Sequence, residues 1–161
     1  MTVYSQPEFL WTINDAFGSV FQDYGFKVSQ ATEDLIIAGK EDIELLFRLE
    51  YSYHMCYLSV EIRLSGQLGE EATSIANRRH IGVTAIAKCL DPNYGRSLAG
   101  ATNLGELRQT AEVDKEDMLR YCRKFLSGDV SSWQQVVDCL QAKAQSGALE
   151  RANPNRRDVS G

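Results

Sequence analysis

Apolar and polar residues follow two different periods along this chain, and the change between them falls near residue 25. Before that point, apolar side chains recur at spacings of three and four, the pattern of a helix with one buried face. The residues on this stripe are Leu10, Ile13, Phe17, Val20, Phe21 and Tyr24. Pro7 suits the first turn of such a helix, and Gly25 suits the left-handed position just past its end. The pattern therefore predicts an N-terminal helix that ends before Gly25.

Apolar and polar residues alternate over residues 26–64, which is typical of antiparallel strands with one face on a core and one in water. Two long runs cover residues 43–51 and 58–64, and a shorter apolar run covers residues 35–38 before Gly39. More than one loop length fits around Gly39, so the pairing of the shorter run with the next strand stays open.

A turn centred on Tyr53 and His54 gives the two long strands a consistent register. It pairs residues 49, 47, 45 and 43 with residues 58, 60, 62 and 64, so that every inward pair is apolar. The same register sets Glu44 opposite Arg63 on the outward face. Opposed unlike charges contribute about 0.2–1 kcal/mol, whereas a slip by one residue would turn the whole apolar row outward. We therefore expect this hairpin.

The next segment mixes loop signals with one short helical pattern. Residues 65–77 are polar with two glycines, and we expect a connecting loop there. Residues 83–90 place apolar side chains on one helical face before Pro92, which predicts a helix. Residues 91–103 are dense in turn formers and predict a second loop.

The remaining residues predict two more helical regions and a polar end. Residues 104–126 carry a helical stripe of apolar side chains, with a kink or break expected at Val113 and Asp114. Ser131 suits the N-cap of a last helix, a contribution of about 1 kcal/mol. Residues 147–161 have almost no apolar side chains, and we expect a flexible tail there.

A helix followed by grouped strands and then by grouped helices indicates an α+β fold. We expect an N-terminal helix, an antiparallel sheet of three to five strands, and C-terminal helices packed on one sheet face. The chain has 161 residues, which suits one compact domain. We assign residues 1–146 to this single domain and residues 147–161 to the tail.

The composition removes several classes of function from consideration. No apolar run approaches the roughly 20 residues needed to span a bilayer, and the N-terminus lacks the pattern of a cleaved secretion signal. The formal net charge of −5 argues against a general nucleic-acid binder. We therefore expect a cytoplasmic protein that binds neither nucleic acid nor membrane.

The cysteines do not form a recognisable framework. Cys56, Cys89, Cys122 and Cys139 include no C-x-x-C pair, so neither a disulfide framework nor a zinc site has support. We expect buried or half-buried reduced thiols.

No motif for catalysis or cofactor binding is present. The sequence lacks a nucleophile elbow, a phosphate-binding loop, a dinucleotide fingerprint and an H-E-x-x-H motif. The two histidines, His54 and His80, have no clear catalytic partner. We therefore expect no catalytic residue, no metal and no cofactor, and we keep an enzyme of unrecognised class as the less favoured alternative.

Charge is distributed unevenly between the two halves of the chain. Residues 1–75 contain 4 basic and 12 acidic side chains, whereas residues 76–161 contain 13 and 10. The half that forms the sheet should therefore have a negative potential, which suits a basic protein partner. The alternative is that this charge serves solubility alone.

The tip of the long hairpin, residues 51–57, has an unusual composition. Such a turn ordinarily consists of Asn, Gly and Asp, whereas tyrosine is enriched at binding hot spots. We expect a partner-binding surface made of the tip, the flanking Glu50 and two outward carboxylates. Its residues are Glu44, Glu50, Tyr51, Tyr53, His54, Met55, Tyr57 and Glu61. The alternative is that later helices fold over the tip and bury its rings.

Two short motifs and the general layout support a resemblance. A first helix closed by Tyr24-Gly25-Phe26, an acidic antiparallel sheet, and the stretch FLSGD (residues 125–129) before Trp133 carry it. Over roughly residues 9–140 the chain resembles small bacterial domains, some of which are similar to immunity proteins of toxin–immunity systems. The resemblance implies a compact cytoplasmic protein that neutralises a toxin by covering its active surface. It assigns no inhibitory residue.

A second resemblance is to type III secretion chaperones, which are also small, acidic, α+β and cytoplasmic, and which bind extended effector segments. Their order usually returns to strands after a middle helix, whereas residues 104–145 are expected to be helical throughout. Our hypothesis is therefore a protein-binding module without catalytic activity. The sequence does not decide between a monomer and a dimer.

Overall fold

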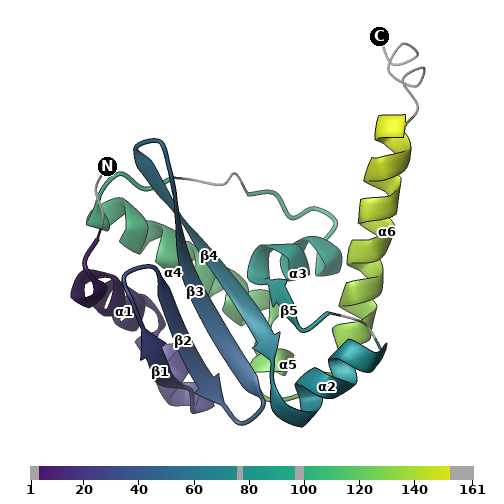
Figure 1. Cartoon of the computed structure of the whole chain (residues 1–161), viewed down its shortest axis with the longest axis horizontal. Helices are drawn as coiled ribbons and strands as arrows, with labels where there is room; N and C mark the ends of the chain where they lie inside the picture. Colours follow the sequence, from purple (N-terminus) through teal and green to yellow (C-terminus); the bar gives the residue numbers. More distant parts are fainter. Residues whose placement is uncertain (1–3, 76–77, 97–99, 153–161) are drawn as a thin grey trace.

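The structure is a computed structural model of the chain, and it describes residues 4–75, 78–96 and 100–152. Its helices and strands confirm the predicted α+β class: along the chain, an N-terminal helix is followed by the strands of one antiparallel sheet and then by C-terminal helices (Figure 1). The elements are α1 (Gln6–Tyr24), β1 (Lys27–Ala31), β2 (Leu35–Lys40), β3 (Ile43–Ser52), β4 (Met55–Leu64), α2 (Gly66–Ile75), β5 (His80–Gly82), α3 (Val83–Leu90), α4 (Leu104–Tyr121), α5 (Arg123–Leu126) and α6 (Trp133–Ala152).

Local chemistry fixes both ends of α1. The main-chain N–H of Glu8 donates to Ser5 Oγ at 3.4 Å, and the N–H of Ser5 donates to Glu8 Oε2 at 2.8 Å. This reciprocal pair is a capping box, which satisfies main-chain donors at the start of the helix. At the other end Gly25 has φ 81°, in the left-handed region that favours glycine. The predicted end of the first helix is confirmed.

The sheet contains five antiparallel strands in the order β1-β2-β3-β4-β5. The register of β3 and β4 is the predicted one, with Leu49 opposite Leu58 and Ile43 opposite Leu64. Glu44 lies opposite Arg63 and accepts two hydrogen bonds from its guanidinium, at 3.2 and 3.1 Å. The pairing of β2 that the sequence left open places Lys40 opposite Ile43.

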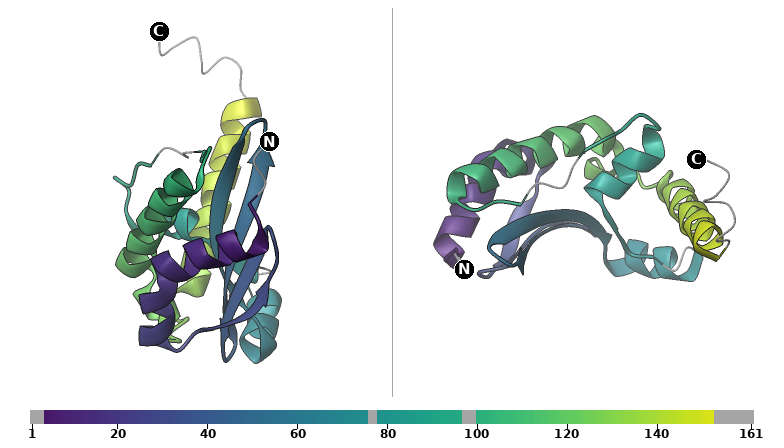
Figure 2. Two further views of the ribbon diagram at one scale, coloured as in Figure 1. Left: turned by 90° about the vertical axis from the view of Figure 1, so that its left-hand side faces the viewer. Right: turned by 90° about the horizontal axis from the view of Figure 1, so that it is seen from above.

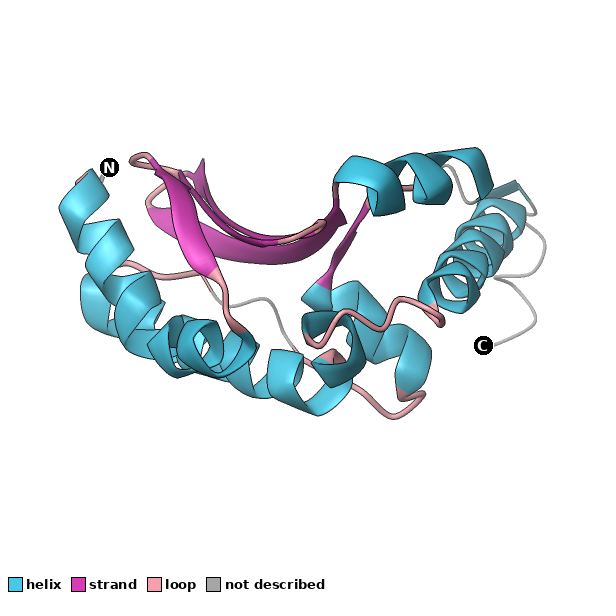
Figure 3. Cartoon of the chain, turned by 90° about the horizontal axis from the view of Figure 1, so that it is seen from below, coloured by secondary structure: helices cyan, strands magenta, loops and turns pink. Residues whose placement is uncertain are grey.

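The helices cover one face of the sheet only. In Figure 2 α1 and α4 lie across the same side of the strands, and α6 stands beyond the β5 edge. The core between these layers includes Phe17 of α1 and Phe47 of β3, which are fully buried with ring centroids 4.7 Å apart. Among the described residues no helix lies over the other face (Figure 3). We call it the outer face. On β3 and β4 its side chains are those of Glu44, Leu46, Arg48, Glu50, Tyr57, Ser59, Glu61 and Arg63.

The expectation of a loop over residues 65–77 is wrong, because Gly66–Ile75 forms α2. Gly69 does not mark a loop. Close packing against the main chain explains why this position has no side chain. A Cβ atom there would lie 2.7 Å from the carbonyl oxygen of Leu64. Leu68 packs against the core and Ala72 is buried, so one face of this polar helix covers the end of β4.

Three expectations about the later helices are also wrong. α4 continues without interruption through Val113 and Asp114 and ends at Tyr121. Ser131 does not directly precede α6, which begins at Trp133, and both its N–H and its Oγ donate to Asp129 Oδ1, at 3.0 and 2.6 Å. α6 begins at Trp133 and continues to Ala152, so it includes residues 147–152, which the sequence analysis places in the tail. Residues 153–161 lie outside the described residues.

The expectation of four reduced thiols is wrong. Cys89 of α3 and Cys139 of α6 form a disulfide, with their Cα atoms 6.0 Å apart. Cys56 and Cys122 are free and buried. Sequence spacing did not reveal this pair because 50 positions separate its members. None of the described helices combines the length and the apolar character needed to cross a membrane.

Candidate functional site

The tip of the β3–β4 hairpin exposes aromatic and thioether side chains. Tyr53 and His54 form its two-residue turn, and Tyr53 is 90% exposed. Met55, the next residue, is 41% exposed. Tyr53 has φ 57°, a left-handed conformation that a side chain with a Cβ atom adopts at a cost of about 1–2 kcal/mol. The turn thus carries a large side chain where the backbone favours Gly or Asn.

The eight residues expected to bind a partner do not all share one surface. Glu44, Glu50, Tyr57 and Glu61 belong to the outer face, and Tyr53, His54 and Met55 form the tip beside it. Tyr51 is the exception, because it lies opposite Cys56 on the side that faces the helices. Its hydroxyl is buried and has no hydrogen-bond partner among the described residues.

The segment before α4 covers one side of the tip. Ala101 and Cys56 exchange two main-chain hydrogen bonds, at 2.9 and 2.8 Å. A Cβ atom on Gly100 would lie 2.7 Å from Met55 Sδ and 3.1 Å from the Tyr57 ring. Met55 and Tyr57 are therefore partly covered by this segment and not by a helix, whereas Tyr53 is left in solvent.

Two of the carboxylates on the outer face have a basic side chain beside them, which the sequence count did not show. Glu44 pairs with Arg63 at 3.1 Å, and Glu61 lies 3.4 Å from His80 Nδ1. The unbalanced carboxylates lie near the tip. The turn of Glu33 and Asp34 is held beside β3, because Asp34 O accepts a hydrogen bond from the N–H of Leu49 at 2.8 Å. Together with exposed Glu50, these side chains form no ion pair within the described part of the chain, and we call them the acidic end.

A cleft of about 560 Å³ opens along the edge of β4 that faces away from β3. Residues 57–60 of β4 form one wall, to which Glu50 of β3 and Gly82 of β5 add. Arg96 and residues of α3, α4 and α6 form the rest. Ala85 and Leu140 add apolar surface, and Asp114 lies at the α4 side. This size is in the range of small-molecule and peptide sites.

Asp114 is the buried polar group of this cleft. Its side chain is 6% exposed, and Oδ1 accepts a hydrogen bond from Arg96. Arg96 also contacts Asp117 at 3.3 Å, and the Tyr94 hydroxyl donates to Asp117 at 2.6 Å. Asp114 Oδ2 is buried with no hydrogen-bond partner among the described residues. Burial raises the pKa of Asp114 to about 6, because loss of solvation outweighs the attraction of Arg96.

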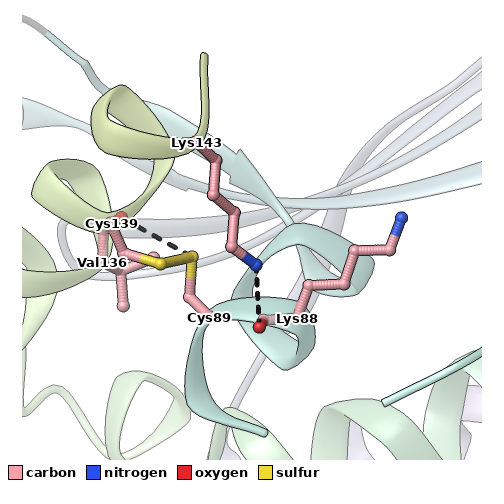
Figure 4. Close-up of a disulfide and its surroundings, with 5 residues drawn as sticks. All are labelled: Lys88, Cys89, Val136, Cys139 and Lys143. Carbon is pink, nitrogen blue, oxygen red and sulfur yellow. Dashed lines mark hydrogen bonds between the residues drawn. A yellow bond between two sulfur atoms is a disulfide. The ribbon is translucent and has the colours of Figure 1, made fainter. Parts of the chain in front are cut away.

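Two lysines lie near the mouth of the cleft, and the disulfide joins the helices that carry them. Lys143 Nζ donates to the carbonyl oxygen of Lys88 at 3.0 Å, which satisfies an acceptor in the last turn of α3 (Figure 4). The ammonium of Lys88 points away from this contact. Cys89 directly follows Lys88 on α3, and Cys139 lies one helical turn before Lys143 on α6. Their disulfide therefore fixes the spacing of α3 and α6 beside this hydrogen bond.

Sequence reasoning missed this cleft because three separate helices and a loop contribute to it. One signal was present. Asp114 occupies a position of the apolar stripe of α4, in line with Leu107, Ala111 and Met118, all of which are buried. A carboxylate in such a stripe predicts either a break in the helix or a buried polar site, and the structure shows the second. Neither His54 nor His80 lines the cleft.

Comparison of the chain with protein-family models, curated proteins and solved structures finds no match. The described residues contain no group of three or more His, Cys, Asp or Glu side chains that could hold a metal ion. The hairpin tip, the acidic end and the cleft are therefore the features from which a function can be inferred.

Proposed function

We propose that this chain is a protein-binding module that engages a basic partner through the hairpin tip and the acidic end. The observation that carries the proposal is Tyr53, which is 90% exposed in a left-handed backbone conformation. Gly or Asn at this position would relieve backbone strain and remove exposed apolar surface. A large side chain there contributes nothing to the fold that we can identify, so its benefit is expected in a complex.

Charge supports the choice of a basic partner. Glu33, Asp34 and Glu50 are the carboxylates beside the tip that have no ion pair within the described residues. Arg48 is the nearest cation on the outer face of the same strand. An excess of unpaired negative charge next to an exposed aromatic group accelerates association with a positive surface and orients it.

The resemblance to immunity proteins gives this proposal its specific form, an inhibitor that covers the active surface of a toxin. A secretion chaperone would instead bind a disordered effector segment. The identity of the partner decides between them, since a folded basic domain supports the first and an unfolded segment supports the second. Absence of catalysis is part of the proposal.

One feature of the structure argues against the expected cytoplasmic location. Disulfides persist in oxidising compartments and are rare in the cytosol. The Cys89–Cys139 disulfide therefore favours an oxidising environment.

The test is affinity measurement with a partner purified from the native source. The double variant Tyr53→Ala with Glu50→Lys is expected to weaken binding at least tenfold, as loss of a hot-spot tyrosine and of a complementary charge does. The matched control is Trp11→Ala with Glu116→Lys, since Trp11 is 56% exposed on α1 and Glu116 is exposed on α4. Unchanged affinity in the first variant, or an equal loss in the control, would show that the surface is elsewhere.

A further inference from the structure

The Cys89–Cys139 disulfide lies where α6 leaves the core. The buried side chains in the first part of this helix are those of Trp133, Val136 and Val137. From residue 138 to residue 147, which we call the outer segment, every side chain is exposed or half-buried. The outer segment continues beyond α3 and away from the sheet (Figure 1). The disulfide therefore ties down the part of α6 that core packing does not hold.

The other described links between the outer segment and its surroundings are weak. Lys143 Nζ donates to the carbonyl oxygen of Lys88 at 3.0 Å, but both residues are exposed, so water competes for this hydrogen bond. Leu140 is half-buried at the edge of the core. The segment itself ends in Ser146 and Gly147, and glycine is a poor helix former. Without the disulfide, little keeps the outer segment in place.

Thiols in solution have access to this disulfide. Neither Cys89 nor Cys139 is fully buried. The ammonium of Lys143 is held at the carbonyl group directly before Cys89, and a neighbouring cation stabilises the thiolate that leaves during exchange. Cys56 and Cys122 are buried, and burial raises the pKa of both thiols, that of Cys122 to about 12. These two cysteines therefore do not compete in the exchange.

We propose that Cys89 and Cys139 form a reversible redox clasp, which keeps the outer segment ordered when oxidised and releases it when reduced. The thiolate of a dithiol reductant attacks one sulfur, forms a mixed disulfide and displaces the other cysteine as a thiolate, which takes up a proton. The second thiol of the reductant then breaks the mixed disulfide and becomes part of a cyclic disulfide. The protein gains two electrons and two protons, and the reductant loses them.

Reduction changes one wall of the cleft and leaves the core in place. The outer segment contributes Leu140 and Lys143 to this wall. The buried first part of α6 keeps Cys139 close to α3, so the same pair forms again on oxidation. Disulfides persist in oxidising compartments and are rare in the cytosol, so the clasp is closed in the first and open in the second. It involves neither the hairpin tip nor the acidic end, and it is independent of the proposed function.

The experiment measures backbone order in ¹⁵N-labelled protein by NMR relaxation, before and after reduction with the dithiol dithiothreitol. We expect order parameters of about 0.85 for residues 141–146 in the oxidised protein and below about 0.6 after reduction. Residues 45–47 of β3 should keep their high values in both states, because the core stays folded. Oxidised glutathione should restore the first values, with two molecules of reduced glutathione released for each disulfide formed.

Two variants separate the disulfide from its neighbours. Cys89→Ala with Cys139→Ala should show the low order parameters without reductant, and dithiothreitol should not change them. Lys143→Gln is the matched control, because it removes the hydrogen bond to Lys88 and keeps the disulfide. Its outer segment should stay ordered until reductant is added.

The comparison by reductant uses the unaltered chain, so it is informative even if the double variant fails to fold. Order parameters of residues 141–146 that change by less than about 0.1 on reduction would overturn the proposal. An equal loss of order in β3, or a failure of oxidised glutathione to restore the first values, would overturn it as well.

Discussion

The Cys89–Cys139 disulfide allows a quantitative prediction about stability. Breaking it, by reduction or by the double variant Cys89→Ala with Cys139→Ala, releases a closed loop whose ends are 50 positions apart. In the chain-entropy account, a closed loop of this length lowers the free energy of folding by about 4 kcal/mol at 25 °C, between about 3 for 15 residues and about 4.7 for 100. This is a large part of the roughly 5–15 kcal/mol that stabilises a typical domain.

The assay is urea unfolding of oxidised and reduced protein, followed by tryptophan fluorescence and circular dichroism. With a slope of about 2 kcal/mol per molar urea, a loss of about 4 kcal/mol lowers the midpoint by about 2 M. The double alanine variant is the control, because it should unfold near the reduced midpoint with or without reductant. Alkylation of the oxidised, unfolded protein should modify two of the four cysteines, Cys56 and Cys122.

Two results would refute this reasoning. Modification of all four cysteines in the oxidised protein would show that no disulfide forms. A midpoint that stays within 0.3 M after complete reduction would show that the link does not constrain the unfolded chain.

Three further predictions follow from single side chains. Tyr53→Asn should raise the free energy of unfolding by about 1 kcal/mol, since Asn tolerates φ 57° better than Tyr, while partner affinity falls; parallel unfolding and binding curves check this. Asp114 has a folded-state pKa of about 6 against 3.8 ordinarily, so the folded state binds the proton more tightly and stability should fall by about 3 kcal/mol as pH rises from well below 3.8 to above 6. Unfolding of the wild type and of Asp114→Asn at several pH values tests it, because the variant should lack this decline. Phe47→Ala should cost about 3–5 kcal/mol, as removal of a fully buried ring does, and a thermal melt would reveal it.

The parts of the fold that could be predicted from sequence are those where one local pattern has one solution. The register of β3 and β4 is such a case, because any slip turns Leu45, Phe47 and Leu49 into water. Gly25 likewise ends α1 through its own conformational freedom. α2 could not be predicted, because Gly69 meets the main chain of Leu64 only in the folded structure.

Of the candidate sites, one could likewise be predicted from a local pattern and the other could not. An aromatic residue in a tight turn is visible in sequence, so Tyr53 could be selected without coordinates. The cleft depends on long-range packing, since Arg96, Asp114 and Lys143 are far apart in the chain and meet only once α3, α4 and α6 pack. The disulfide belongs to this second group. The orientation of Tyr51 toward the helices follows from the pairing register, but its hydroxyl's lack of a hydrogen-bond partner within the described ranges could not be foreseen.

Hydrogen exchange on the purified complex is the most direct test of where this protein binds its partner. We predict slower exchange for amides of residues 50–57 and of the turn at residues 32–34, with α1 and α4 unchanged. Slower exchange confined to α1 and α4, with the hairpin exchanging as in the free protein, would contradict the assignment of Tyr53 and its neighbours to the docking surface.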